Sequence, residues 1–280
     1  MKDTYELRRL ISEVKTKLNE DDAQEELKAI LKQDYSTFVK DLGTNIKDEK
    51  FVNAIKSLSD KAPVKTSGMA PAVTELRPTQ NEVVMDKSLS YPLKDPSSAE
   101  AYLKGGTVSV AGKSIVTGGG GKFVIDGHHR WSQLFCINPD AKISALDLTD
   151  IKKPLEALKA TQIGIAAQTG TVPTAAGGGV NLFTVGEDAL KSYVIENIKE
   201  PVIDVFAKYG KGDTPETIAD YIWGNVETLK STSKPVDGAP ARDVMPQTDD
   251  APAWVDNTFN VEKIPESVVR RLKELMKYNK

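Results

Sequence analysis

The stretch Ile125–Arg130 constrains the fold of this chain more than any other feature. It reads Ile-Asp-Gly-His-His-Arg and follows the apolar run Phe123–Ile125. Apolar residues with helical spacing come directly after it, in 131–135. The pattern predicts a strand, a tight turn at Gly127 and a helix that begins at once.

The predicted turn places two imidazoles and a guanidinium at a helix N-terminus. Free N–H groups and the helix dipole attract anions there, and Arg130 can bind a phosphate through two parallel hydrogen bonds. His128 and His129 are the only histidines of the chain. One interpretation is a phosphate site formed by Gly127–Arg130. The alternative is an ordinary Asp126-Gly127 turn followed by solvated histidines.

Composition indicates a globular protein, and its net charge bears on which ligands it favours. The chain is 39% hydrophobic and 28% charged. No stretch is as long as a membrane span, and Met1–Glu6 lacks the apolar core of a signal peptide, so we expect a cytoplasmic protein with no membrane partner. The net charge of -3 favours a small anionic ligand over long DNA. Cys136 is the single cysteine, which excludes an intramolecular disulfide and a Cys-rich zinc site.

Changes in composition and hydrophobic pattern along the chain divide it into segments. The expected segments are a helical module over 1–62, a mixed domain over 73–150, a mainly helical region over 151–230, a proline-rich linker over 231–258 and a C-terminal helix over 259–280. Asn19–Asp21 is expected to break the first helix. Within the mixed domain, β-prone runs alternate with helical ones, and this predicts an α+β fold.

Four β-prone runs of the mixed domain give specific predictions of strands. Residues 114–116 and 123–125 are expected to form a hairpin across the glycine loop Gly118–Gly121. Residues 83–85 are expected to form a strand, and residues 142–148 alternate as one further strand.

Two motifs together carry a resemblance to a known family. Leu76–Glu82 (Leu-Arg-Pro-Thr-Gln-Asn-Glu) precedes the strand, the Asp126–Arg130 motif and the helix. This order resembles the ParB/sulfiredoxin superfamily, and most closely its ParB-like nuclease branch and the free serine kinases. The resemblance covers roughly residues 73–150. It implies a compact α+β domain that binds the phosphates of ATP or another nucleotide together with Mg²⁺.

The resemblance also implies roles for individual residues. Gly127, His128, His129 and Arg130 would contact phosphates. In a phosphoryl-transfer enzyme, Arg130 and a histidine would neutralise developing charge while Glu82 accepts the proton of an attacking hydroxyl.

A nuclease would use the same residue types differently. Asp126 and Glu82 would bind a metal, and His128 or His129 would activate water or protonate the leaving oxygen. For Glu82 the alternative is an exposed acid at a strand edge. For Asp126 the alternative is stabilisation of the turn.

Departures from the family pattern restrict the chemistry. Sulfiredoxins have a cysteine where this chain has His128, so sulfinic-acid repair is not expected. Partition ParB proteins have Gly-Glu-Arg-Arg where this chain has Gly127–Arg130, and no helix-turn-helix follows.

Three functional hypotheses result: a nucleotide-binding phosphotransfer or phosphate-hydrolysing enzyme, a ParB-like nuclease or DNA-binding protein, and a non-enzymatic assembly protein of the kind that phages encode. In the third, the mixed domain would bind a nucleotide only as a structural ligand, and the helical flanks would bind a protein partner or a second copy.

Overall fold

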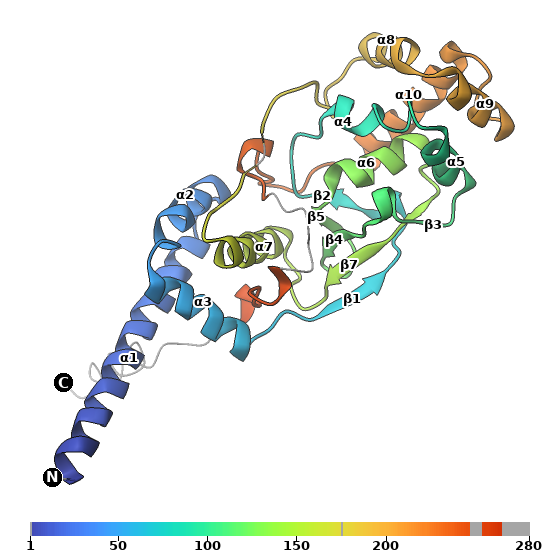
Figure 1. Cartoon of the computed structure of the whole chain (residues 1–280). Helices are drawn as coiled ribbons and strands as arrows, with labels where there is room; N and C mark the ends of the chain where they lie inside the picture. The colour runs from blue at the N-terminus through green and yellow to red at the C-terminus, as the bar shows by residue number, and fades with distance from the viewer. Residues whose placement is uncertain (1, 175, 247–253, 265–280) are drawn as a thin grey trace. The chain divides into compact units, whose positions relative to one another are not determined.

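The computed structural model describes residues 2–174, 176–246 and 254–264 (Figure 1). The chain forms two compact units, each built from separate segments. The first unit contains Met1–Val64, Lys159–Pro173 and Thr248–Lys280, and the second contains Lys65–Leu158 and Thr174–Gln247. This division differs from the expected linear series of segments, because parts of the chain that are distant in sequence pack into one unit. Most of the predicted C-terminal helix, residues 265–280, lies outside the described residues.

The described residues combine helices with a mixed sheet, which confirms the predicted α+β class. The helices are α1 (Lys2–Leu31), α2 (Tyr35–Asn45), α3 (Glu49–Lys61), α4 (Met85–Leu89), α5 (Pro96–Lys104), α6 (His128–Ile137), α7 (Pro154–Thr169), α8 (Glu187–Asn197), α9 (Glu200–Lys208) and α10 (Pro215–Thr232). The strands are β1 (Thr66–Met69), β2 (Arg77–Pro78), β3 (Thr107–Val108), β4 (Ile115–Gly118), β5 (Phe123–Asp126), β6 (Lys142–Ile143) and β7 (Ala145–Leu148). Among the described helices, none has both the length and the apolar run that crossing a membrane requires.

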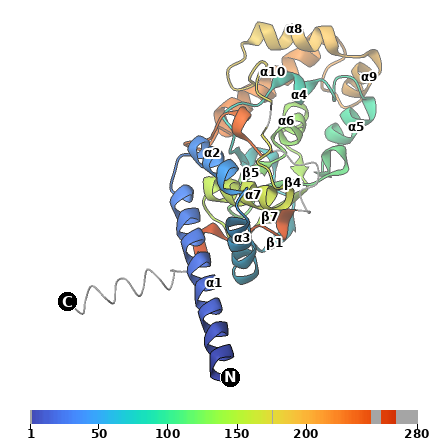
Figure 2. The same cartoon turned by 60° about the vertical axis from the view of Figure 1, so that its left-hand side comes forward.

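In the first unit, helix α1 runs unbroken through residues 19–21, so the predicted break there is wrong. No glycine or proline interrupts it, and polar residues alone do not end a helix. Helices α2 and α3 lie beside its C-terminal part (Figure 2). Lys159 stabilises that end, because its Nζ donates to the carbonyls of Leu31 and Gln33, at 2.5 and 2.9 Å.

The second unit is organised around a five-stranded sheet with the strand order β1-β7-β4-β5-β2. Strands β4 and β7, and β5 and β2, run parallel, whereas β1 with β7 and β4 with β5 run antiparallel. The β4–β5 pair is the predicted hairpin. The single strand predicted over 142–148 is divided, because β6 pairs with β3 in a separate two-stranded sheet. The strand predicted over 83–85 is reduced to one bridge, between Val84 and Asn181, and Met85 begins α4.

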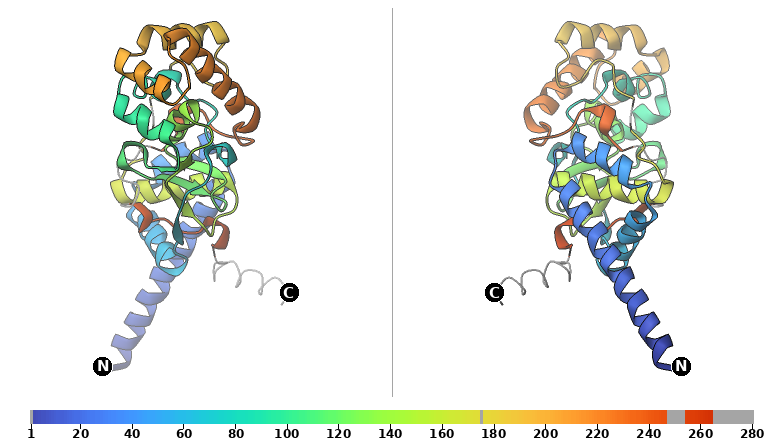
Figure 3. Two further views of the ribbon diagram at one scale, coloured as in Figure 1. Left: turned by 90° about the vertical axis from the view of Figure 1, so that its right-hand side faces the viewer. Right: turned by 90° about the vertical axis from the view of Figure 1, so that its left-hand side faces the viewer.

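Helix α6 lies at the centre of the second unit and buries the apolar residues that its spacing predicted. Trp131, Leu134 and Phe135 have no exposed surface, and the indole N–H of Trp131 donates to the Val73 carbonyl at 2.9 Å. Helix α10 packs against α6, with α8 and α9 beside α10 (Figure 3). Cys136 is buried, and burial raises the pKa of its thiol to about 12, as fits a small core residue.

The turn before α6 requires glycine for two reasons, its positive φ and the lack of space for a Cβ. Two alanine variants separate the energetic costs of these reasons. Gly127 has φ +91°, and a Cβ there would lie 2.7 Å from Ile115 Cγ2 and 3.0 Å from Arg130 Nη2. Gly106 has φ +81°, but a Cβ added to it would meet no atom within 4 Å. We expect Gly127→Ala to lower the free energy of unfolding by about 2–4 kcal/mol and Gly106→Ala by about 1 kcal/mol. Urea denaturation measures both, and equal losses would show that crowding at Gly127 is unimportant.

Candidate anion site at the start of helix α6

The strand–turn–helix predicted around Gly127 is present. Strand β5 ends at Asp126, Gly127 is in the left-handed conformation, and α6 begins at His128. The first helical hydrogen bond joins the Trp131 N–H to the Gly127 carbonyl at 2.9 Å. Within the described chain, no acceptor is bonded to the backbone N–H groups of residues 128–130. The start of α6 therefore has the free donors expected of an anion site.

Arg130 and Asp126 are used within the turn itself. Arg130 Nη2 donates to Asp126 Oδ2 at 2.9 Å, and Nη1 donates to the Ser114 carbonyl at 2.6 Å. Burial raises the pKa of Asp126, whereas the nearby Arg130 acts in the opposite direction and is the smaller effect. Both side chains therefore stabilise the strand–helix turn, which was the alternative considered for Asp126.

The predicted metal role of Asp126 does not fit this arrangement. Its Oδ2 is bonded to Arg130, a cation that competes with a metal ion for the same oxygen. Among the described residues, no group of three or more His, Cys, Asp or Glu side chains is placed to hold a metal. We therefore derive no step through a Mg²⁺ ion held by Asp126.

His128 faces the interior and connects two segments. Its side chain is buried, and Nε2 accepts a hydrogen bond from the Thr79 N–H at 3.2 Å, which that N–H shares with the Val124 carbonyl. Thr79 Oγ1 in turn donates to the Val124 carbonyl at 2.7 Å. Burial, followed by the charges of His129 and Arg242, lowers the pKa of His128 to about 3. A neutral, buried ring with an occupied nitrogen holds the loop in place rather than exchanging protons with a substrate.

His129 is placed between two hydrogen-bond donors. Its Nε2 accepts from the Val84 N–H at 3.2 Å, so a neutral ring must carry its proton on Nδ1. Arg242 Nη1 lies 3.3 Å from that Nδ1. Burial first, and then the charges of Arg242 and Lys87, lower the pKa of His129 to about 3. In that tautomer the Nδ1–H and the Arg242 guanidinium are both donors, so neither can accept a hydrogen bond from the other.

Arg242 is the residue that sequence analysis missed, because it lies in the predicted linker. It is only 6% exposed, and its Nε donates to the Ala176 carbonyl at 2.9 Å. Residues 234–246, here called the strap, run along the loop that follows β2. The Val236 N–H donates to the Pro78 carbonyl, and the Asn81 N–H donates to the Pro240 carbonyl, each at 3.0 Å. The prolines of the strap favour an extended chain, which is the conformation that such pairing needs.

Glu82 lies in the loop between β2 and α4 and is half-buried. Burial lowers the pKa of Arg242, and the negative charge of Glu82 acts in the opposite direction, so the two side chains are electrostatic neighbours. The structure thus brings together Glu82, His129 and Arg242. It separates them from His128, which is interior, and from Arg130, which is bonded to Ser114.

Comparisons of the chain with protein-family models, with curated proteins and with solved structures give no match. The superfamily resemblance therefore stays a prediction, and the geometry of the site carries the functional argument.

The lowered pKa values of both histidines predict a loss of stability in mild acid. In the unfolded chain the two histidines take up protons near pH 6.5, whereas in the folded chain they do so only near pH 3. The free energy of unfolding should therefore fall as pH decreases below about 6.5, by up to about 1.4 kcal/mol for each histidine and each pH unit.

Urea denaturation between pH 7.5 and pH 5 tests this expectation. Because the chain has only two histidines, His128→Gln should remove about half of the slope, and His128→Gln with His129→Gln nearly all of it. An unchanged slope in the double variant would assign the pH dependence to other groups.

Proposed function

We propose that the second unit binds a phosphate-bearing ligand, ATP or another nucleotide, with a phosphate oxygen beside both Arg242 Nη1 and His129 Nδ1 at the start of α6. The observation that carries this proposal is the 3.3 Å contact between Arg242 Nη1 and His129 Nδ1, which are both donors in the tautomer that the Val84 hydrogen bond requires. An anionic oxygen beside them would accept from both groups. Charge-assisted bonds of this kind are short and strong, and Arg is well suited to phosphate.

The surrounding charges support an anion rather than a neutral acceptor. The positive charges of Arg242 and Lys87 both act on His129, and Glu82 is the carboxylate that acts on Arg242. Two cations against one carboxylate leave a positive balance near the free N–H groups of α6. The dipole of α6 adds to this balance, because its N-terminus is the positive end.

The proposed chemistry is phosphoryl transfer or phosphate-ester hydrolysis, as the superfamily resemblance implies. In this proposal His129 donates its Nδ1–H to a phosphate oxygen and stays neutral, because its Nε2 already accepts from Val84. Arg242 supplies the positive charge that Arg130 was expected to supply. Glu82 accepts the proton of the attacking hydroxyl or water. A nucleotide would bring Mg²⁺ on its own phosphates.

Replacing Arg242 tests the phosphate site. We expect Arg242→Gln to weaken ATP binding by at least about tenfold, the loss of one charged hydrogen bond, and Arg242→Lys to weaken it less. Isothermal titration with ATP, ADP and CTP, each with Mg²⁺, measures the change. Arg9→Gln is the matched control, because Arg9 is an exposed arginine of the first unit. Unaltered affinity in Arg242→Gln, with the fold intact, would exclude this site.

Replacing Glu82 separates binding from turnover. Glu82→Gln keeps the size of the side chain and removes its capacity to accept a proton. We expect nucleotide affinity to be kept, or to rise slightly, and phosphate release to fall by about 100-fold or more. Phosphate release from ATP, measured with and without candidate hydroxyl acceptors, gives the rate. Wild-type turnover in Glu82→Gln would remove its assignment as the base.

A further inference from the structure

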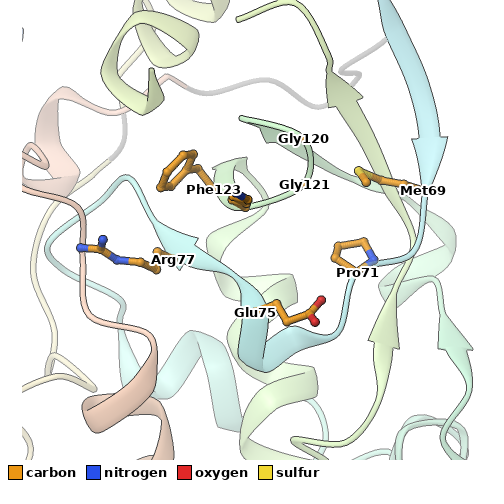
Figure 4. Close-up of a pocket in the computed structure, with 8 residues that line it drawn as sticks. Met69, Pro71, Glu75, Arg77, Gly120, Gly121 and Phe123 are labelled. Atoms are coloured by element: carbon orange, nitrogen blue, oxygen red, sulfur yellow. The ribbon is translucent and has the colours of Figure 1, made fainter. Parts of the chain in front are cut away.

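A cavity lies at the other end of strand β5 from the α6 turn. It has a volume of about 620 Å³ and is lined by Met69, Pro71, Glu75, Arg77, Gly120, Gly121, Lys122 and Phe123 (Figure 4). Phe123 begins β5 and Asp126 ends it, so the strand separates this cavity from the anion site. The volume is typical of sites for small organic molecules, about 300–1,000 Å³.

The cations of the lining do not fill this cavity. Arg77 donates through Nε and Nη2 to the Lys234 and Pro235 carbonyls, at 3.0 and 2.9 Å, so its charge is directed to the strap. In Figure 4 its side chain runs away from Met69 and Pro71. Lys122 is exposed.

A buried carboxylate lies directly behind the wall of the cavity. Asp147, on β7, is 1% exposed. Its Oδ1 accepts from the Gly121 N–H at 2.8 Å and from Thr117 Oγ1 at 3.0 Å. Its Oδ2 has no hydrogen-bond partner within the described residues. An unpaired buried carboxylate oxygen is costly, and a positively charged donor relieves that cost best.

Met69, which lines the cavity, lies against the two groups that bond Asp147 Oδ1. Gly121 has φ +75°, and a Cβ there would lie 2.6 Å from Met69 Sδ and Cε, so the thioether lies against the Gly121 backbone. Met69 Sδ is also 3.9 Å from Thr117 Oγ1. The side chain therefore covers the two groups that hold Asp147. Methionine is unbranched and changes rotamer easily, and rotation of Met69 would open the cavity toward Asp147.

We propose that this cavity binds a small organic cation, a primary amine or guanidine on a short apolar stem. The cationic group donates to Asp147 Oδ2 once Met69 has rotated. The stem lies against Met69, Pro71 and Phe123. Glu75, which has no ion-pair partner among the described residues, adds negative charge at the rim. The proposal is independent of the phosphate site.

A charge-matched ligand series tests the proposal on the full chain without nucleotide. The probes are pentylamine, 1-pentanol and pentanoate, and benzylamine, benzyl alcohol and benzoate. The ¹³C-methyl signals of the five methionines report binding, with Met69 assigned from Met69→Leu. We expect the two amines to shift the Met69 signal saturably. The alcohols should bind at least about tenfold more weakly, and the acids should not bind. No saturable shift with either amine, or equal affinity of the alcohols, would overturn the proposal.

Variants locate the charge that recognises the amine. Asp147→Asn keeps the Oδ1 acceptor and should weaken amine binding by at least about tenfold, while Glu75→Gln should weaken it only a few-fold. Arg242→Gln should leave it unchanged, which separates this cavity from the phosphate site. Full amine affinity in a folded Asp147→Asn would refute the assignment. If Asp147→Asn does not fold, the amine-to-alcohol ratio of the wild type decides.

Discussion

Two consecutive imidazoles join the first turn of α6 to the loop that follows β2. His128 Nε2 accepts the Thr79 N–H, and His129 Nε2 accepts the Val84 N–H. The loop that carries Glu82 is thereby fixed to the first turn of α6 at both of its ends. Each bond requires a neutral ring with a free lone pair on Nε2. The tautomer of His129 and its relation to Arg242 follow from this requirement, while Asn181 and the strap provide further hydrogen bonds to the loop.

The sequence predicted local structure well where apolar periodicity was strong. The turn at Gly127, the buried face of α6 and the β4–β5 hairpin were predicted because each depends on neighbours in sequence. The division of residues 142–148 between two sheets was not, because it depends on pairing with β3 and β4, which are distant in the chain. The run 83–85 has strand composition, yet tertiary contacts place Met85 at the start of α4.

The sequence predicted the candidate site in part. Helix geometry explains why the residues that the structure brings together differ from the predicted ones. Successive residues of a helix point about 100° apart, so His128, His129 and Arg130 cannot share one direction. His128 turns inward to Thr79, Arg130 turns to Ser114, and His129 meets Arg242. No spacing rule could have found Arg242, because it lies over a hundred positions from His129 in a proline-rich segment without periodicity. The proximity of Arg242 to His129 depends on the tertiary structure, in which the strap runs along the loop after β2.

The strap contacts residues that lie beside the two ends of β5. Through the carbonyls of Lys234 and Pro235 it binds Arg77 beside the cavity, and through Arg242 it reaches His129 at the start of α6. One short segment is therefore shared by two places that could hold ligands of opposite charge. Thermodynamic linkage makes any such sharing reciprocal. If an amine shifts the strap and changes the affinity for phosphate by some factor, phosphate must change the affinity for the amine by the same factor.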